Sequence, residues 1–443
     1  MIYDFVVLGA DGQIGILACR YLLKHGYRIL ASDLFSENVR REIKDLPPSD
    51  FFTFRRCDHR YTQAIESVIR AGGCPTVINC ADDFYNDNVF DACLLTGVNH
   101  VDMGSELNAT RRRQRRHKQF KRAGLTAIQG CGSVPGIGGV MLRHLSRRFS
   151  RMVRVESGFA WDSNQKTFVS PFFLFVVLYE MSEPAYVLEN GQLRKVAPKS
   201  IKRTRNFAGV GKQTVYAAPH PEVFTYKHYF PEIQSCTFFA GFPEHTMKVI
   251  DALNAVGLNY NKPVWCVGES GEFAIHPSDF LSVICKMQRF PDGYEETENL
   301  WTEVWGRANG KRVHHKMECL VPPIDGYAKY GCNIDTAFPG CVLAEMVKDG
   351  QITEHGVFAT ESNCIPTALF LERMVDLGFS FRIDNQPCLN FDTYEQNQNG
   401  STPTAKHRHP SHRRVDTSRV QPAPNDRGAS RTPESELAAV RVC

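Results

Sequence analysis

The strongest chemical signal in the sequence is a glycine triad near the N-terminus, Gly9, Gly12 and Gly15. It follows a short apolar run, residues 5–8, and precedes a segment with helical spacing, residues 16–25. In such a strand–turn–helix the first glycine permits the turn, the second lets the backbone approach a pyrophosphate, and the third lets the helix pack on the strand. The helix N-terminus adds free N–H groups. The pattern predicts a dinucleotide-binding loop made of Gly9, Asp11, Gly12, Gln13, Ile14 and Gly15.

An acidic residue follows the second predicted strand, residues 28–32, where dinucleotide-binding folds hold the adenosine ribose. Asp33 lies 18 residues after Gly15. A carboxylate there accepts hydrogen bonds from both ribose hydroxyls and repels a 2′-phosphate, so Asp33 favours NAD as the cofactor. NADP stays open, because Arg40 and Arg41 either bind such a phosphate or form a solvated helix face.

Polar residues also follow the later predicted strands, at the sheet edge where doubly wound folds bind ligands. Asp58 either borders the adenine or caps the helix that begins near residue 61. Cys80 ends the fourth strand and Ala81 follows it, and we expect this strand end to face the nicotinamide. At the next strand end, Asp102 is a general acid/base, an amine anchor or only a helix cap. His100 beside it titrates in the physiological range.

A third strand-end loop, residues 130–139, is rich in glycine and contains Ser133, Pro135 and Gly136. We expect it to face the nicotinamide together with the two loops before it. No HExxH, CxxC or GxSxG pattern occurs in the sequence, so neither a metal site nor nucleophilic catalysis is predicted. The pair at residues 314–315, both histidines, is read as part of a strand.

The elements that position these residues alternate over the first 150 residues, which predicts βαβ units and a parallel sheet. The predicted strands are residues 5–8, 28–32, 51–56, 76–80, 100–102 and 125–128. The predicted helices are residues 16–25, 61–71, 88–96 and a basic stretch that ends near residue 124. Beyond residue 150 the segments alternate or are aromatic-rich, which indicates antiparallel strands, and helical spacing returns at residues 335–349 and 366–377.

This pattern predicts an α/β protein with a Rossmann-type doubly wound parallel sheet, a second α+β domain and a disordered C-terminal tail. The expected domains are a dinucleotide-binding domain, residues 1–140, and a substrate and dimerisation domain, residues 141–340. Helices in residues 341–394 then pack back on the first domain. Residues 395–443 are too polar to offset their ordering entropy. The histidines in this tail either form a metal-binding tract or are solvated.

Composition excludes several classes of protein. The net charge is +4, yet residues 1–394 carry 44 basic and 43 acidic side chains, so the body is neutral and no nucleic-acid partner is expected. Residues 111–122 hold eight Lys/Arg, either a basic targeting or RNA-binding stretch or, as we favour, a solvated helix face. The longest apolar window has seven residues, too short for a membrane span. The 15 scattered cysteines indicate reduced thiols and a cytoplasmic protein.

The order of these motifs resembles the saccharopine dehydrogenase family, and within it the lysine 6-dehydrogenase and saccharopine reductase-like branch. The likeness spans about residues 4–380. Its further motifs are residues 97–104, 130–139, 218–222, 338–340, 343–350 and 356–358, together with Thr225. The resemblance implies a Rossmann domain, a second domain with a mixed sheet and a homodimer. It also implies oxidative deamination or reductive imine chemistry on an amino acid, with NAD(P).

The resemblance also implies roles for single residues. Cys80 and Ala81 would lie beside the nicotinamide ribose, Asp102 would match an active-site aspartate, and residues 133–136 would border the substrate. Residues 360–366 depart from the family pattern, in which a Pro-Glu precedes the last helix. Arg143 and Lys227 are candidates for a substrate carboxylate by location alone. Two alternatives therefore stay open: a Rossmann reductase of C–O or C–C bonds, and a non-catalytic NAD(P)-sensing protein.

Overall fold

A computed structural model describes residues 3–46, 49–170, 174–268, 271–286, 291–388 and 391. The predicted disordered tail, residues 395–443, lies outside the described residues. Among the described residues, no helix combines the length and the apolar composition that crossing a bilayer requires.

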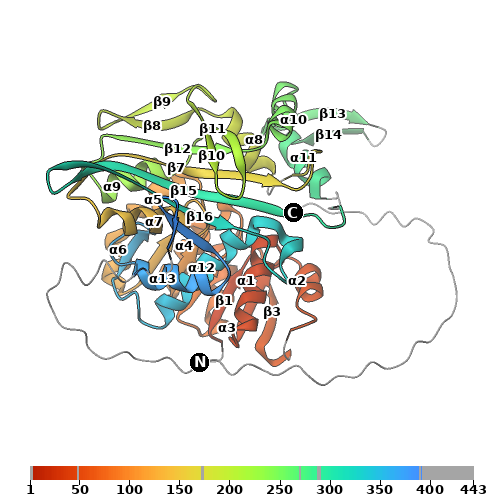
Figure 1. Cartoon of the computed structure of the whole chain (residues 1–443). Helices are drawn as coiled ribbons and strands as arrows, with labels where there is room; N and C mark the ends of the chain where they lie inside the picture. The colour runs from red at the N-terminus through yellow and green to blue at the C-terminus, as the bar shows by residue number, and fades with distance from the viewer. Residues whose placement is uncertain are drawn as a thin grey trace, which may run out of the picture. The chain divides into compact units, whose positions relative to one another are not determined.

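The first 130 residues supply six strands of a parallel sheet, as the alternating pattern predicts, and a later strand, residues 356–359, makes it seven-stranded (Figure 1). The strand order is β17-β6-β5-β4-β1-β2-β3. The strands are β1 (Phe5–Leu8), β2 (Ile29–Asp33), β3 (Phe52–Arg56), β4 (Thr76–Asn79), β5 (Asn99–Asp102), β6 (Thr126–Gln129) and β17 (Gly356–Ala359). Apolar clusters on both faces bury β1, β4 and β6 completely. The strand order reverses between β1 and β4, which is where such sheets bind ligands.

The helices of this domain include those that the sequence predicts and a further one at residues 137–146 that was not predicted. They are α1 (Gln13–Lys24), α2 (Glu37–Glu42), α3 (Thr62–Gly72), α4 (Asn86–Thr96), α5 (Leu107–Gln114), α6 (His117–Ala123) and α7 (Ile137–Ser146), with short 3-10 turns η1 (Ser49–Phe51) and η2 (Asp83–Tyr85). The basic stretch differs from the prediction, because it forms two helices, α5 and α6, rather than one. Gly97 and Gly124 end α4 and α6 in the left-handed conformation, at φ 73° and 67°.

The middle of the chain forms a ten-stranded mixed sheet. Its strands are β7 (Arg151–Ser163), β8 (Ala185–Glu189), β9 (Gln192–Val196), β10 (Lys202–Phe207), β11 (Gly211–Ala217), β12 (Ser235–Gly241), β15 (Glu296–Ala308), β16 (Lys311–Val321), β18 (Ser380–Ile383) and β19 (Gln386–Pro387). Only β12 and β7 pair in parallel among these strands. The helices are α8 (Leu174–Ser182), α9 (Glu222–Tyr229), α10 (Glu244–Ala255) and α11 (Pro277–Lys286), and a separate hairpin joins β13 (Val264–Gly268) to β14 (Gly271–Ile275).

The last part of the chain returns to the first sheet through η3 (Ala328–Asn333), α12 (Ile334–Lys348), β17 and α13 (Thr367–Asp376). Helix α12 packs on α1, where Tyr21 donates a hydrogen bond of 3.2 Å to Glu345 and its ring lies 5.3 Å from that of Phe338. Helices that pack back on the first domain were expected in residues 341–394, and α12 begins earlier, at Ile334. The prediction did not include β17, which adds an edge strand to the parallel sheet beside β6.

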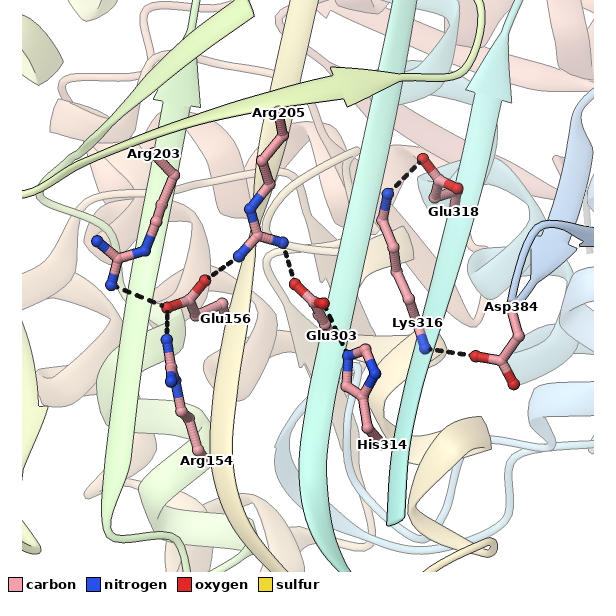
Figure 2. A network of polar contacts seen from close by, with 9 residues as sticks. All are labelled: Arg154, Glu156, Arg203, Arg205, Glu303, His314, Lys316, Glu318 and Asp384. Atoms are coloured by element: carbon pink, nitrogen blue, oxygen red, sulfur yellow. Dashed lines mark hydrogen bonds and ion pairs between the residues drawn. The ribbon is translucent and has the colours of Figure 1, made fainter.

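One face of the mixed sheet carries a network of ion pairs that spans β7, β10, β15 and β16 (Figure 2). Glu156 is buried and binds Arg154, Arg203 and Arg205, and Arg205 also binds Glu303. His314 of β16 donates a 2.7 Å hydrogen bond from Nε2 to the carboxylate of Glu303. The guanidinium groups of Arg154 and Arg205 lie over the rings of Trp305 and Trp301, at 4.4 and 4.9 Å, so charged side chains of the network cover aromatic surface.

Candidate active site

The glycine loop between β1 and α1 has the geometry that a dinucleotide needs. Gly9 has φ +72°, and a Cβ there would lie 2.5 Å from the backbone nitrogen of Ala81. A Cβ on Gly15 would lie 2.0 Å from the carbonyl oxygen of Gly9, so only glycine lets α1 pack this closely. Gly12 differs, because its Cβ would meet only the Gly9 oxygen, at 3.4 Å. The space beside Gly12 is thus open to a ligand.

The first turn of α1 presents free N–H groups to that space. Gly12 is the N-cap of the helix, no side chain caps it, and no acidic residue lies in its first turn. Gln13 and Ile14 begin the helix and line the cavity described below. Backbone donors at an uncapped helix N-terminus bind phosphate groups. The loop therefore fits the pyrophosphate of a dinucleotide.

The end of β2 carries two neighbouring carboxylates. Asp33 accepts hydrogen bonds from the backbone N–H groups of Asp11 (3.0 Å) and Leu34 (2.7 Å). The Asp11 carboxylate in turn accepts one from the backbone of Val39, at 2.7 Å, and fixes the start of α2. Burial and the neighbouring Asp33 raise the pKa of Asp11. Two carboxylates at the predicted ribose position keep NAD as the predicted cofactor, because they would repel a 2′-phosphate.

The other candidates near the ribose have local partners. The Arg40 guanidinium lies over the rings of Phe52 and Phe54, at 5.9 and 5.8 Å. Arg41 donates to the side chain of Asn38 at 3.0 Å. Asp58 accepts from the backbone and the guanidinium of Arg60, at 3.0 and 2.7 Å, and so organises the turn before α3.

A cavity of about 380 Å³ lies at the carboxyl ends of the parallel strands and reaches the mixed sheet. The sequence-predicted residues that line it are Gly12, Gln13, Ile14, Cys80, Ser133 and Pro135. Gly9, Asp11, Gly15, Asp33, Ala81 and Gly136 are not among its lining residues. Gly136 packs against Gly132, which lines the cavity. A Cβ on Gly136 would lie 1.7 Å from the carbonyl oxygen of Gly132, so only glycine fits at this position.

His100 and Asp102, the two predicted catalytic residues, do not line the cavity. Both are fully buried. Asp102 accepts hydrogen bonds from the backbone of Gly104 (2.8 Å) and Gly130 (3.3 Å), so it holds two loops rather than facing a substrate. Burial lowers the pKa of His100 to about 4, which keeps its ring neutral. The sequence does not show that His100 and Asp102 are buried away from the cavity.

A histidine between two carboxylates lines the cavity instead. His220 Nδ1 lies 2.5 Å from Oε2 of Glu222, and its Nε2 lies 3.5 Å from Oε1 of Glu180. The imidazole also stacks on Phe238 at 3.8 Å. Burial alone would lower the pKa of His220, but the two carboxylates raise it to about 9. Burial raises the pKa of Glu180, and His220 opposes that shift.

Two further carboxyl groups, Glu298 of β15 and Asp335 of α12, complete an acidic wall. Both are buried. Burial raises the pKa of each, and the proximity of Asp335 raises that of Glu298 further. Oε2 of Glu180 and Oδ2 of Asp335 have no hydrogen-bond partner among the described residues. Buried oxygens of this kind are available to a donor on a ligand.

Comparison with known proteins agrees with this architecture. The saccharopine dehydrogenase NADP binding domain matches residues 5–128, and the saccharopine dehydrogenase C-terminal domain matches residues 138–378. The chain belongs to the saccharopine dehydrogenase family. The resemblance drawn from the sequence motifs is thereby confirmed, and so is a nicotinamide dinucleotide as the cofactor. The choice between NAD and NADP stays a prediction.

Individual members of the family are distant from this chain. Carboxyaminopropylagmatine dehydrogenase of Synechocystis sp. is 23% identical over 318 residues, which cover 69% of this chain and 78% of the relative. Carboxynorspermidine synthase of Vibrio alginolyticus is 22% identical over 331 residues, with 69% and 77% covered. The apo saccharopine dehydrogenase (L-Glu forming) of Saccharomyces cerevisiae superposes with a TM-score of 0.65 at 14% identity and covers 86% of this chain and 99% of its own. The family is one of oxidoreductases, and this chain shares its fold.

The cationic candidates for a substrate carboxylate do not reach the cavity of this family member. Arg143 donates from Nε to the carbonyl oxygen of Glu361 at 2.6 Å. Lys227 donates to the carbonyl oxygens of Pro231 and Ile233, at 2.6 and 3.0 Å. Neither lines the cavity, and among the described residues that do, there is no lysine or arginine.

Sequence reasoning missed the acidic wall of the site. Glu180, His220, Glu298 and Asp335 come from four distant segments. The sequence around Glu298 carries no clear signal of this role, because the same strand also contains Glu296 and Glu303. His220 and Glu222 lay in a motif that supported the resemblance, but no role had been assigned to them.

Proposed function

We propose that this protein transfers a hydride between a nicotinamide dinucleotide and the carbon of a C–N bond in a substrate that carries an amine. The acidic wall is the observation that carries this proposal. Glu180, Glu298 and Asp335 line the same cavity as the first turn of α1. A cationic nitrogen that enters this cavity loses its hydration shell. Buried carboxylate oxygens without a partner compensate for that loss, because they offer hydrogen bonds and an opposite charge.

The chain's own residues supply binding and proton transfer. When bound, the nicotinamide ring donates or accepts the hydride. His220 holds a proton at Nε2, since Nδ1 is occupied by Glu222. In reduction it gives this proton to the substrate nitrogen, and in oxidation it takes one back. Glu180 beside it binds the ammonium form of the substrate and fixes the reacting nitrogen near Nε2.

The substrate class follows from the charges in the cavity. A free amino acid, the substrate that the family resemblance implied, needs a cation for its carboxylate, and the described lining residues offer none. The curated relatives are named for carboxyaminopropylagmatine and carboxynorspermidine, and by their names both compounds are amines that also carry a carboxyl group. The lining residues themselves favour an amine with more than one nitrogen over an α-amino acid held through its carboxylate.

A substrate screen tests the proposal against its two alternatives. The full chain is mixed with NADH or NADPH, a carbonyl compound and a series of diamines, polyamines or amino acids, and the absorbance of the reduced nicotinamide is followed. Oxidation of the same amines is measured in reverse with NAD and NADP. We expect turnover that requires an amine and falls in the His220→Gln variant.

Two other results of the screen would overturn the proposal. Turnover of ketones or enones without any amine would identify a reductase of C–O or C–C bonds. Dinucleotide binding without turnover of any substrate would favour a cofactor-sensing protein.

A further inference from the structure

One arginine of the basic stretch is not solvated. Arg113 on α5 is 1% exposed, whereas its neighbour Arg112 is exposed and binds Asp87 at 2.8 and 3.0 Å. The Nε of Arg113 lies 3.5 Å from the side-chain oxygen of Gln129, and its two terminal nitrogens have no partner among the described residues. A buried guanidinium costs several kcal/mol unless opposite charges compensate it.

Two carboxylates lie near this cation. Asp102 ends β5, which pairs with β6, and it accepts a hydrogen bond of 3.3 Å from the backbone of Gly130, the residue after the Gln129 that Arg113 contacts. Asp83 in η2 meets Asp102 at Gly104. Burial raises the pKa of Asp83 to about 6, while Arg113 lowers it and Asp102 and Asp82 raise it. His100 contributes no charge, because its ring is neutral. Arg113 is thus the one cation, among the groups that act on Asp83, that opposes the two neighbouring acids.

These carboxylates hold the loops that form part of the cavity wall. Asp83 accepts hydrogen bonds from the backbone N–H groups of Ser105 and Glu106, both at 3.0 Å. Asp102 accepts from Gly104 and Gly130. The two acids converge on Gly104, where a Cβ would lie 2.2 Å from Oδ1 of Asp83 and 3.1 Å from Oδ1 of Asp102.

Residues from both loops face the cavity. Met103 and Ser105 come from the loop after β5, and Gly132 to Pro135 come from the loop that begins at Gly130. Asp83 and Asp102 therefore lie between the buried Arg113 and the loops that line the cavity.

We propose that Arg113 is a positioning residue of this site: its buried positive charge balances Asp83 and Asp102, and these carboxylates hold the loops of residues 103–106 and 130–136 in the cavity wall. Without that charge, the pKa of Asp83 rises from about 6 toward neutrality. A protonated carboxyl is a weaker acceptor for the N–H groups of Ser105 and Glu106, so the first loop detaches.

The test compares Arg113→Gln, Arg113→Lys and the exposed control Arg112→Gln in the full chain. Amide hydrogen exchange of residues 103–106 and 130–136 is measured from pH 6 to pH 9, after correction for the intrinsic exchange rate, together with the Kd for NADH. In Arg113→Gln we expect at least about tenfold faster exchange of residues 103–106 at pH 7, with recovery toward pH 9 as Asp83 ionises. Arg113→Lys and Arg112→Gln keep the wild-type profile.

A profile of Arg113→Gln that matches that of Arg112→Gln would overturn the proposal, and so would a loss of protection that is uniform along the chain and independent of pH. If Arg113→Gln does not fold, the double variant Arg113→Gln/Asp83→Asn decides, because it removes the cation and its titrating partner together. We expect it to fold, with residues 103–106 exchanging fast at every pH. A double variant that fails as the single one does contradicts the role of Asp83. None of these readouts depends on the proposed substrate.

Discussion

His220 and Glu222 form a buried pair in which Nδ1 of the imidazole lies 2.5 Å from Oε2 of the carboxylate, across a single proline in the chain. The contact fixes the ring and leaves Nε2 toward Glu180 and the cavity. A carboxylate that orients a histidine and stabilises its cation is a recurrent arrangement in proton transfer. The first prediction follows from this pair.

Replacing His220 removes the proposed proton donor and acceptor. His220→Gln is expected to lower turnover of the amine substrate by about 10²–10⁴-fold. Glu222→Gln lowers the pKa of His220 from about 9, so the rise of kcat/KM with pH in the oxidative direction moves to lower pH. Steady-state pH profiles measure both effects, and the exposed His228→Gln is the control. An unchanged profile in Glu222→Gln would exclude His220 from the chemistry.

The acidic wall makes a prediction about substrate affinity. Glu180→Gln keeps the shape of the side chain and removes its charge, so the KM for the amine is expected to rise by about 10–100-fold with a smaller change in kcat. Glu183→Gln, one turn later and exposed, is the matched control. Equal KM values in the two variants would show that Glu180 does not bind the amine.

Asp33 makes a prediction about the cofactor. Asp33→Ala removes the carboxylate that we expect to bind the ribose hydroxyls, so NADH affinity falls by about 10–100-fold and NADPH affinity falls less or rises. Binding is measured by the fluorescence of the reduced nicotinamide. The exposed Glu37→Ala at the start of α2 serves as control. NADH affinity that survives Asp33→Ala contradicts the assignment of the ribose site.

Glu298 and Asp335 make a prediction about stability. Their pKa values are raised in the folded protein, so the folded state binds protons more tightly than the unfolded chain, and stability falls as pH rises above the ordinary carboxyl range of about 4. Glu298→Gln removes one of the two charges. At pH 8 we expect it to be more stable than the wild type by about 1–3 kcal/mol, with little change at pH 4.

Unfolding midpoints between pH 4 and pH 9 measure this difference, and Glu295→Gln, exposed just before the same strand, is the control. If Glu298→Gln and the wild type lose stability in parallel as pH rises, the two carboxyl groups do not repel each other as inferred.

The sequence alone determined the dinucleotide loop. The glycine triad, the strand before it and the helix after it are contiguous. Gly9 and Gly15 are required by close backbone contacts, such as the one between Gly15 and the Gly9 carbonyl, and Gly12 leaves space for a ligand. The parallel sheet was also predictable, because short apolar runs separated by helices leave few other topologies. The one conspicuous error in this region, a single basic helix in place of α5 and α6, concerns a surface where periodicity is weak.

Only the tertiary structure decided which acids line the cavity and which residue of the basic stretch is buried. The mixed sheet and the return of α12 bring together Glu180, His220, Glu298 and Asp335. The spacing of these residues in the chain does not indicate that they line one cavity. Arg113 is indistinguishable in sequence from Arg112. Whether a charged side chain is solvated or buried depends on what packs against it from distant segments, and that is a property of the fold.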